Sequence, residues 1–97
     1  MPYRIVFSRE VRRQLLDLPG HVKPLAKQEI AGLSDHPRPE RSHELAGHPD
    51  TFRLWLGADH RLVWHVFDDE QMVEIEYVGP KMPNLYDRLQ RSRPPSE

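Results

Sequence analysis

The second half of the chain holds three short β-prone runs in close succession, and they constrain the fold more than any other feature. The runs are TFRLWL (51–56), RLVWHVF (61–67) and MVEIEYV (72–78), with four-residue turn segments between them. The first and third alternate apolar with polar residues, and the second is aromatic and β-branched, as in strands that bury one face. Connections this short join antiparallel neighbours, so the runs predict an antiparallel three-stranded meander.

The first third of the chain predicts one strand and two helices. The run YRIVFS (3–8) is β-prone and ends at a serine that can cap a helix. Over residues 9–18, apolar side chains recur every three or four positions, as in an amphipathic helix. The segment LPGH (18–21) breaks this pattern, and a second apolar stripe covers residues 22–33. Pro24 is tolerated in the first turn of the second helix, so the pair predicts an αα-hairpin.

The segments on either side of the meander are less regular. Residues 34–50 are polar and rich in proline and glycine, and they are expected to form a loop with a brief pairing segment at 43–45. Gly79 and Pro80 are expected to end the last strand and to turn the chain. Residues 84–91 predict a short C-terminal helix.

Together these elements predict a single α+β domain over residues 1–91, followed by a frayed tail at 92–97. The order is β-α-α-β-β-β with a short C-terminal helix, which gives a four-stranded, mainly antiparallel sheet packed on an α-hairpin. No apolar run approaches the roughly 20 residues that cross a bilayer, and the N-terminal segment has no signal-peptide pattern. The absence of cysteine excludes disulfides and thiolate metal sites, and a cytoplasmic location is expected.

The charge balance limits how this chain can bind nucleic acid. It has 14 Lys and Arg against 15 Asp and Glu, a formal net charge of −1. Proteins that bind nucleic acid through charge usually carry a clear basic excess. Any nucleic-acid contact must therefore come from a local patch.

One such patch is predicted on the sheet face that points away from the helices. Successive side chains of a strand point to opposite faces. If the apolar residues of 51–56 face the helices, Arg53 and Trp55 face away, and Arg61 and His65 of the next strand join them. Guanidinium groups bind phosphate and aromatic rings stack unpaired bases, so this set suits single-stranded RNA. The alternative is an ordinary solvated face, on which the arginines pair with the glutamates of the third strand.

The six histidines do not form an obvious metal site. His60 and His65 are five positions apart in a strand, so they point to opposite faces. His43 and His48 fall in the predicted loop without a third ligand. We therefore expect no metal and no other cofactor.

Several of these stretches resemble the RelE/ParE superfamily of bacterial toxins, and RelE-type messenger-RNA interferases in particular. The matching stretches are YRIVFS, the helix pair, the PR at 37–38, LAGHPDTFRLWLGADHRLVWHV and VGPK…Y, and they span about nine-tenths of the chain. The resemblance implies the toxin of a type II toxin-antitoxin system. Such a toxin cleaves messenger RNA in the ribosomal A site, without a metal, by attack of a ribose 2′-hydroxyl that leaves a 2′,3′-cyclic phosphate.

The resemblance also implies roles for individual residues. Arg53 and Arg61 take the basic positions on the strands, Lys81 takes a position that is often arginine, and Tyr86 takes the position of a C-terminal tyrosine. Trp55 stands where a second strand lysine is often found. A stiff Gly-Pro corner is expected to hold Lys81 toward the strand arginines. The predicted set is catalytic Arg61, Lys81 and Tyr86, with RNA-binding Arg53, Trp55 and His65.

The implied partners are a cognate antitoxin, the ribosome and messenger RNA, with DNA contacted only through the antitoxin and no membrane. A hydrophobic groove is expected to take an antitoxin segment, as a helix laid against the sheet or the C-terminal helix. Two alternatives remain open at this point. One is a ParE-like gyrase inhibitor, and the other is a weakly active toxin that acts mainly as an antitoxin-binding partner.

Overall fold

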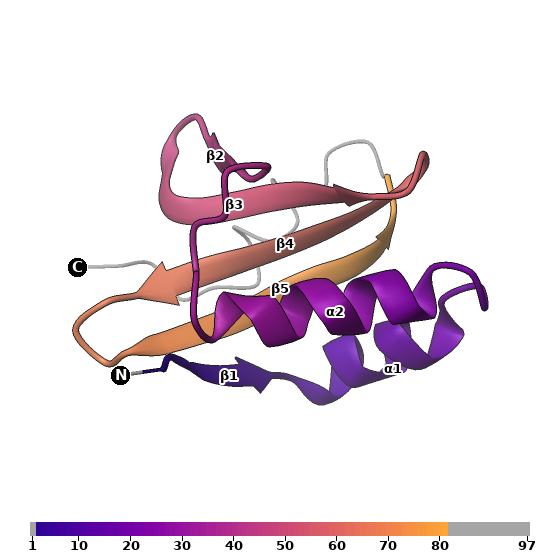
Figure 1. Cartoon of the computed structure of the whole chain (residues 1–97), viewed down its shortest axis with the longest axis horizontal. Helices are drawn as coiled ribbons and strands as arrows, with labels where there is room; N and C mark the ends of the chain where they lie inside the picture. The colour runs from indigo at the N-terminus through magenta and orange to yellow at the C-terminus, as the bar shows by residue number, and fades with distance from the viewer. Residues whose placement is uncertain (1, 82–97) are drawn as a thin grey trace.

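The computed structural model describes residues 2–81 of the 97-residue chain, and these form one mixed sheet with two helices packed on it (Figure 1). The elements are, in order, β1 (Arg4–Phe7), α1 (Arg9–Asp17), α2 (Lys23–Leu33), β2 (His43–Leu45), β3 (His48–Leu56), β4 (His60–Phe67) and β5 (Met72–Pro80). The sheet has five strands in the order β1-β5-β4-β3-β2. β1 pairs parallel to β5, and all other neighbours are antiparallel.

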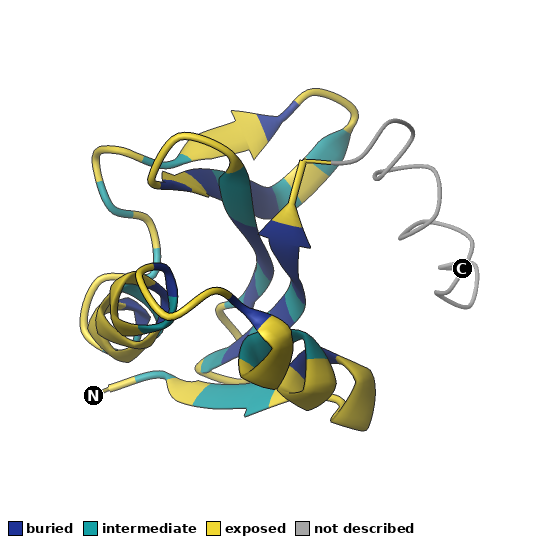
Figure 2. Ribbon diagram, turned by 90° about the vertical axis from the view of Figure 1, so that its right-hand side faces the viewer, coloured by how far each residue is buried: buried dark blue, intermediate teal, exposed yellow. Residues whose placement is uncertain are grey.

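The predicted helical hairpin is confirmed. The Ser8 side chain caps α1 by accepting a hydrogen bond of 3.2 Å from the Val11 N–H, a contact worth about 1 kcal/mol in helices generally. Pro24 lies in the first turn of α2, where its missing N–H costs no helical hydrogen bond. Both helices lie on the same face of the sheet (Figure 2).

The core lies between the helices and one face of the sheet. Trp64 is fully buried there, as its alternation with apolar neighbours predicts, and its indole N–H donates to the Pro37 carbonyl at 2.8 Å. The Phe52 ring stacks beside it, with 6.0 Å between centroids. The helices contribute Val11, Ala26 and Leu33 to the same cluster. Phe52 on β3 and Trp64 on β4 therefore face the helices.

The prediction of four strands is wrong, because residues 43–45 form a fifth strand at the edge of the sheet. β2 pairs antiparallel with β3, which begins at His48 and not at residue 51. Gly47 makes the reversal possible with a φ of 78°, a left-handed conformation that glycine adopts without strain. The brief pairing segment expected at 43–45 is confirmed as β2, whereas His48, expected in the loop, begins β3.

The last strand also departs from prediction, because it contains a β-bulge. Val63 pairs with Tyr77 while the next residue of β4, Trp64, pairs with Ile75, so Glu76 is an extra residue in β5. Simple alternation placed Tyr77 on the same face as Ile75, toward the core. The bulge instead places Tyr77 on the opposite face, beside Val63.

Gly79 and Pro80 do not end the strand as predicted, because they continue its pairing with β4. Gly79 pairs with Arg61 and Pro80 with His60. The predicted helix at 84–91, with Tyr86, and the tail at 92–97 lie outside the described residues. Within residues 2–81, neither helix has the length and apolar character that a membrane span requires.

Candidate functional site

The distal face of the sheet, which points away from the helices, carries the predicted site residues of β3 and β4. Phe52, Leu54 and Leu56 belong to the core, so the residues between them point the other way. The register places Trp55 directly opposite Arg61. Arg53, Trp55 and Arg61 therefore lie on one face of the sheet.

Three of these side chains converge at one end of the distal face, and we call Trp55, Arg61 and Lys81 the cation–indole cluster. The Arg61 Cζ lies 4.4 Å from the centroid of the Trp55 ring, and the Lys81 Nζ lies 5.9 Å from it. Both distances fall within the range of cation–π attraction. Trp55 is 38% exposed, so an incoming ligand can reach this residue.

Lys81 is held at this place by its own backbone and by Tyr77. The Lys81 N–H donates to the Asp59 carbonyl at 3.0 Å. The Tyr77 hydroxyl donates to the Pro80 carbonyl, and its oxygen would lie only 2.9 Å from a Cβ placed on Gly79. Only glycine leaves room for the tyrosine at that point. The chain therefore reaches Lys81 through continued strand pairing and Tyr77 packing, and not through the predicted Gly-Pro corner.

Arg53 borders the cluster on β3. It lies two residues from Trp55 on the same face, a separation of about 7 Å along a strand. It is half-buried, and its guanidinium forms no ion pair with another residue of the described part of the chain. The guanidinium is thus placed to contact a ligand that extends beyond the cluster.

The structure does not bring His65 into the cluster. His65 lies four residues from Arg61 along β4, about 13 Å away at the usual rise of a strand. Its Nδ1 lies 2.8 Å from the Thr51 hydroxyl, and its ring lies 4.5 Å from the ring of Phe67. The separation leaves His65 outside the group of cations. Tyr86, the third predicted catalytic residue, lies outside the described residues.

A second polar network ties the opposite end of the sheet together. Arg38 donates hydrogen bonds to Asp68 at 2.8 and 3.1 Å and to Asp50 at 3.1 Å, and the Tyr3 hydroxyl donates to Asp68 at 2.6 Å. The bond from Arg38, followed by that from Tyr3, lowers the pKa of the Asp68 carboxyl. The bond to Asp68 raises the pKa of the Tyr3 hydroxyl. This network joins the start of β1, the α2–β2 loop and the β4–β5 turn, so its role is structural.

Sequence reasoning missed the contribution of Tyr77, because regular alternation groups this residue with Val73 and Ile75 on one face. The bulge that redirects Tyr77 leaves no mark in an alternating run, because MVEIEYV reads as regular over its whole length. The one available signal was the glycine two residues further on, since a glycine in a strand often marks a close approach. Among the described residues, no three histidine, aspartate or glutamate side chains group closely enough to hold a metal ion.

The cluster offers chemistry that suits a phosphodiester. A guanidinium uses its edge to hydrogen-bond two phosphate oxygens, whereas stacking on a ring uses its flat face, so the two contacts are compatible. An ammonium adds a point charge, and an exposed indole supplies a surface on which a base can stack. The cluster therefore combines cations that can bind phosphate with an aromatic residue that is partly exposed.

Solved structures of the same architecture were found by comparison of the folds. The isolated E. coli RelE toxin is 24% identical over 93% of this chain and 97% of its own, with a TM-score of 0.72. The archaeal RelE-RelB complex from Pyrococcus horikoshii is 25% identical over 82% of this chain and 96% of its own, with a TM-score of 0.71. The intact E. coli RelBE toxin-antitoxin complex is 24% identical over 84% and 99%, with a TM-score of 0.72. No protein-family model and no curated protein matches the sequence.

The protein is a small α+β domain with a helical hairpin on one sheet face and the cation–indole cluster on the other. More particularly, the chain has the fold of the RelE toxins. The resemblance recognised in the sequence is thereby confirmed at the level of the fold.

Proposed function

We propose that this chain is the toxin of a type II toxin-antitoxin system and that it cleaves messenger RNA in the ribosomal A site. The observation that carries the proposal is the cation–indole cluster, which combines two cations and an exposed indole at one end of the distal face. Its position in a RelE fold adds support, because structures of that fold include RelE toxins and their complexes with RelB antitoxins. A cytoplasmic location follows from this role.

In the proposed reaction, a ribose 2′-hydroxyl loses its proton and attacks the adjacent phosphorus. The bond from phosphorus to the 5′-oxygen breaks, that oxygen takes up a proton, and the products are a 2′,3′-cyclic phosphate and a 5′-hydroxyl. Arg61 and Lys81 stabilise the negative charge that develops on the phosphorane. Lys81 is also placed to protonate the leaving oxygen, and the resemblance assigns Tyr86 to proton acceptance or stacking. No metal takes part in this scheme.

The remaining residues bind the substrate. Trp55 stacks on a base next to the scissile phosphate, and Arg53 contacts a neighbouring phosphate. His65, about 13 Å from Arg61 at the usual strand rise, contacts RNA further along the distal face. In this scheme a protein of near-neutral net charge can act on RNA, because the few cations that contact the RNA lie close together.

The test compares the wild type with Arg61→Ala and Lys81→Ala in a reconstituted translation reaction, with transcript ends mapped at codon resolution. Loss of one charge-stabilising group costs about 100-fold in rate, so each variant should cleave about 100 times more slowly. Arg13→Ala removes an exposed cation from α1, on the other side of the molecule, and should cleave like the wild type. Undiminished cleavage in both site variants would remove the assignment.

A second assay distinguishes the main alternative. The same preparations are added to DNA gyrase, and DNA supercoiling is measured. A nuclease of this kind leaves supercoiling unchanged. Inhibition of gyrase together with intact transcripts would replace the nuclease proposal with a ParE-like activity.

A further inference from the structure

Trp55 lies against both cations of the cation–indole cluster. The Arg61 Cζ lies 4.4 Å from the centroid of its ring and the Lys81 Nζ lies 5.9 Å from it. The separation of the two charges cannot exceed the sum of these distances, which is comparable with the Debye length of about 8–10 Å near physiological salt. Like charges this close repel each other, so they favour side-chain conformations that move them apart into water.

The pairing of the strands brings Arg61 to the ring. Arg61 on β4 pairs with Trp55 on β3 and with Gly79 on β5, so its neighbours across the sheet are an indole and a residue without a side chain. Residues paired on adjacent strands point to the same face. The guanidinium therefore meets an aromatic side chain on the β3 side, and stacking there is compatible with phosphate binding through its N–H edge.

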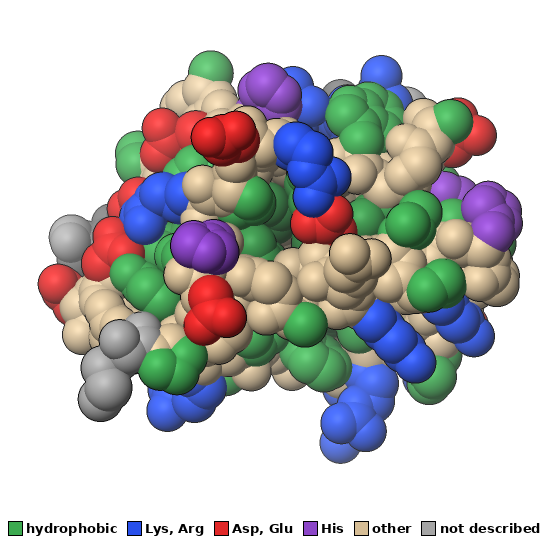
Figure 3. Space-filling model, viewed as in Figure 1, with side chains coloured by type: hydrophobic (Ala, Val, Ile, Leu, Met, Phe, Trp, Pro, Cys, Tyr) green, Lys and Arg blue, Asp and Glu red, His purple; other side chains and the backbone are tan. Residues whose placement is uncertain are grey.

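Lys81 approaches the same ring from beyond the end of β5. Within residues 2–81, no carboxylate lies within ion-pair distance of its ammonium. Other cations of this part of the chain do pair with carboxylates, as Arg38 and Arg41 do. Figure 3 shows such acidic and basic side chains next to one another on the helix side. For Lys81, the indole stands in the place that a carboxylate takes elsewhere.

An indole attracts cations without neutralising them. The face of an aromatic ring is the negative end of its quadrupole, and tryptophan attracts a cation more strongly than tyrosine or phenylalanine does. A carboxylate at the same place would take hydrogen-bond donors from the phosphate and would repel the negative RNA backbone. The ring therefore holds two cations close together and leaves their positive charge unchanged.

We infer that Trp55 is a positioning residue of the proposed reaction, because its ring holds Arg61 and Lys81 side by side for the scissile phosphate. The inference rests on the proposed function for the reaction, and it adds a second role to the base stacking assigned to Trp55 there. The position often holds a lysine in RelE-type toxins, according to the resemblance. A lysine here would have the opposite effect, because a third positive charge would repel the other two.

The test separates turnover from RNA binding by measuring kcat and KM for messenger-RNA cleavage in a reconstituted translation reaction. Trp55→Leu should lower kcat about tenfold, and Trp55→Phe, which keeps a smaller aromatic face, should recover most of that loss. Trp55→Lys should lower kcat at least tenfold, although it adds a cation that RNA can bind. The control is Leu25→Lys, which makes the same charge change on α2 at an apolar residue that is 39% exposed, and kcat should stay unchanged.

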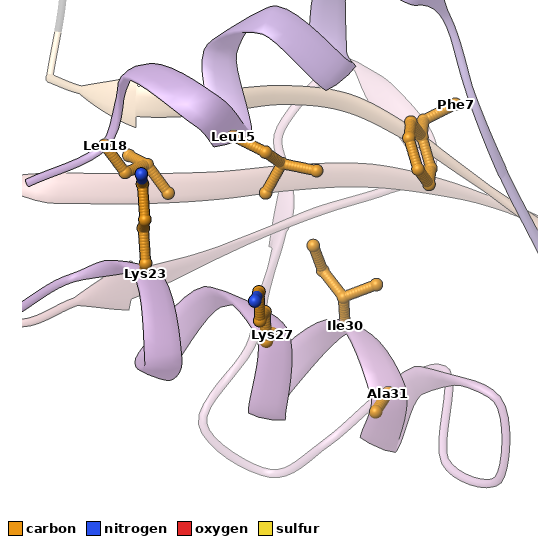
Figure 4. Close-up of a pocket in the computed structure, with 7 residues that line it drawn as sticks. All are labelled: Phe7, Leu15, Leu18, Lys23, Lys27, Ile30 and Ala31. Atoms are coloured by element: carbon orange, nitrogen blue, oxygen red, sulfur yellow. The ribbon is translucent and has the colours of Figure 1, made fainter. Parts of the chain in front are cut away.

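NMR of the chain with ¹³C-methylated lysines gives a readout that needs no RNA. The ring of Trp55 shifts the Lys81 signal in the wild type, and Trp55→Leu should return this signal to the random-coil value. Lys23 and Lys27, the other two lysines of the chain, line a cavity between α1 and α2 on the helix side (Figure 4). Their signals should stay in place if the variant is folded.

The outcomes distinguish this inference from the proposed function. A wild-type kcat in Trp55→Leu and Trp55→Lys, with any change confined to KM, would overturn the inference and leave the nuclease proposal intact. An unmoved Lys81 signal in Trp55→Leu would overturn it as well. If the wild type does not cleave RNA at all, the proposed function fails, whereas a Lys81 signal that depends on Trp55 would still support the positioning of the cation by the ring.

Discussion

At the scale of single residues, Tyr77 links the irregularity of β5 to the position of Lys81. The extra residue Glu76 turns Tyr77 onto the distal face, and there its hydroxyl donates to the Pro80 carbonyl, one residue before Lys81. Its ring occupies the space that a side chain at position 79 would need. We regard Tyr77 as a positioning residue, because it acts on the reaction only through the backbone that carries Lys81.

Tyr77→Phe should therefore slow cleavage while leaving the fold intact. The change keeps the ring and removes one hydrogen bond, worth about 1 kcal/mol, so the rate should fall about fivefold. The independent measurement is NMR of the chain with ¹³C-methylated lysines, of which there are only Lys23, Lys27 and Lys81. The Lys81 signal, shifted in the wild type by the Trp55 ring, should move toward the random-coil value. The other two signals serve as internal controls, and an unmoved Lys81 signal would refute the positioning role.

At the scale of elements, the sequence predicts the features that follow from local periodicity, such as which face of a strand is buried. It misses features that depend on pairing between strands. The alternation of β3 places Arg53 and Trp55 on one face, and the structure agrees. β2 has only three residues, so the sequence indicated a brief pairing segment there but not a fifth strand, and Gly47 reverses the chain against β3. The bulge at Glu76 gives no signal in the sequence, because the sequence of a strand is the same whether or not its pairing with the neighbouring strand shifts by one residue.

The hydrogen-bond network around Arg38 makes the stability of the folded protein depend on pH. In the folded state, hydrogen bonds from Arg38 and then Tyr3 lower the pKa of Asp68. The associated stabilisation is present above the unfolded pKa of about 3.9 and is lost as the pH falls through the lower folded value. The raised pKa of Tyr3 has the opposite sign, so its contribution is present below about pH 10 and is lost as the pH rises through the folded value.

Thermal melting of Asp68→Asn tests this account. At pH 7 the variant should melt at a lower temperature than the wild type, because the charge that binds Arg38 is gone. The two melting temperatures should converge as the pH falls below the folded pKa of Asp68, where the wild-type carboxyl is neutral as well. Asp69→Asn is the matched control on the exposed neighbouring residue. A difference between wild type and Asp68→Asn that stays constant from pH 7 to pH 2 would contradict the linkage.

At the scale of the whole molecule, the sheet separates two surfaces with different chemistry. The distal face carries the cations and the indole that we propose contact RNA, and the helix side carries a cavity between α1 and α2 whose lining includes Lys23 and Lys27. Neither surface requires a basic protein, since each depends on two or three local cations. The formal charge of −1 is therefore compatible with RNA cleavage. With so few cations involved, the affinity for RNA should depend only weakly on salt concentration.

That dependence is measurable as the effect of salt on affinity for a fluorescently labelled single-stranded RNA. Each phosphate neutralised on a single strand contributes about 0.7 to the slope of log affinity against log salt. Arg53, Arg61 and Lys81 are the cations at or beside the cluster, so the slope should be about −2. Arg61→Ala should bring the slope close to −1.4, whereas Arg13→Ala should leave it unchanged. A slope much steeper than −2 in the wild type would mean that RNA follows a basic surface outside the cluster, because three cations do not release enough counterions to produce it.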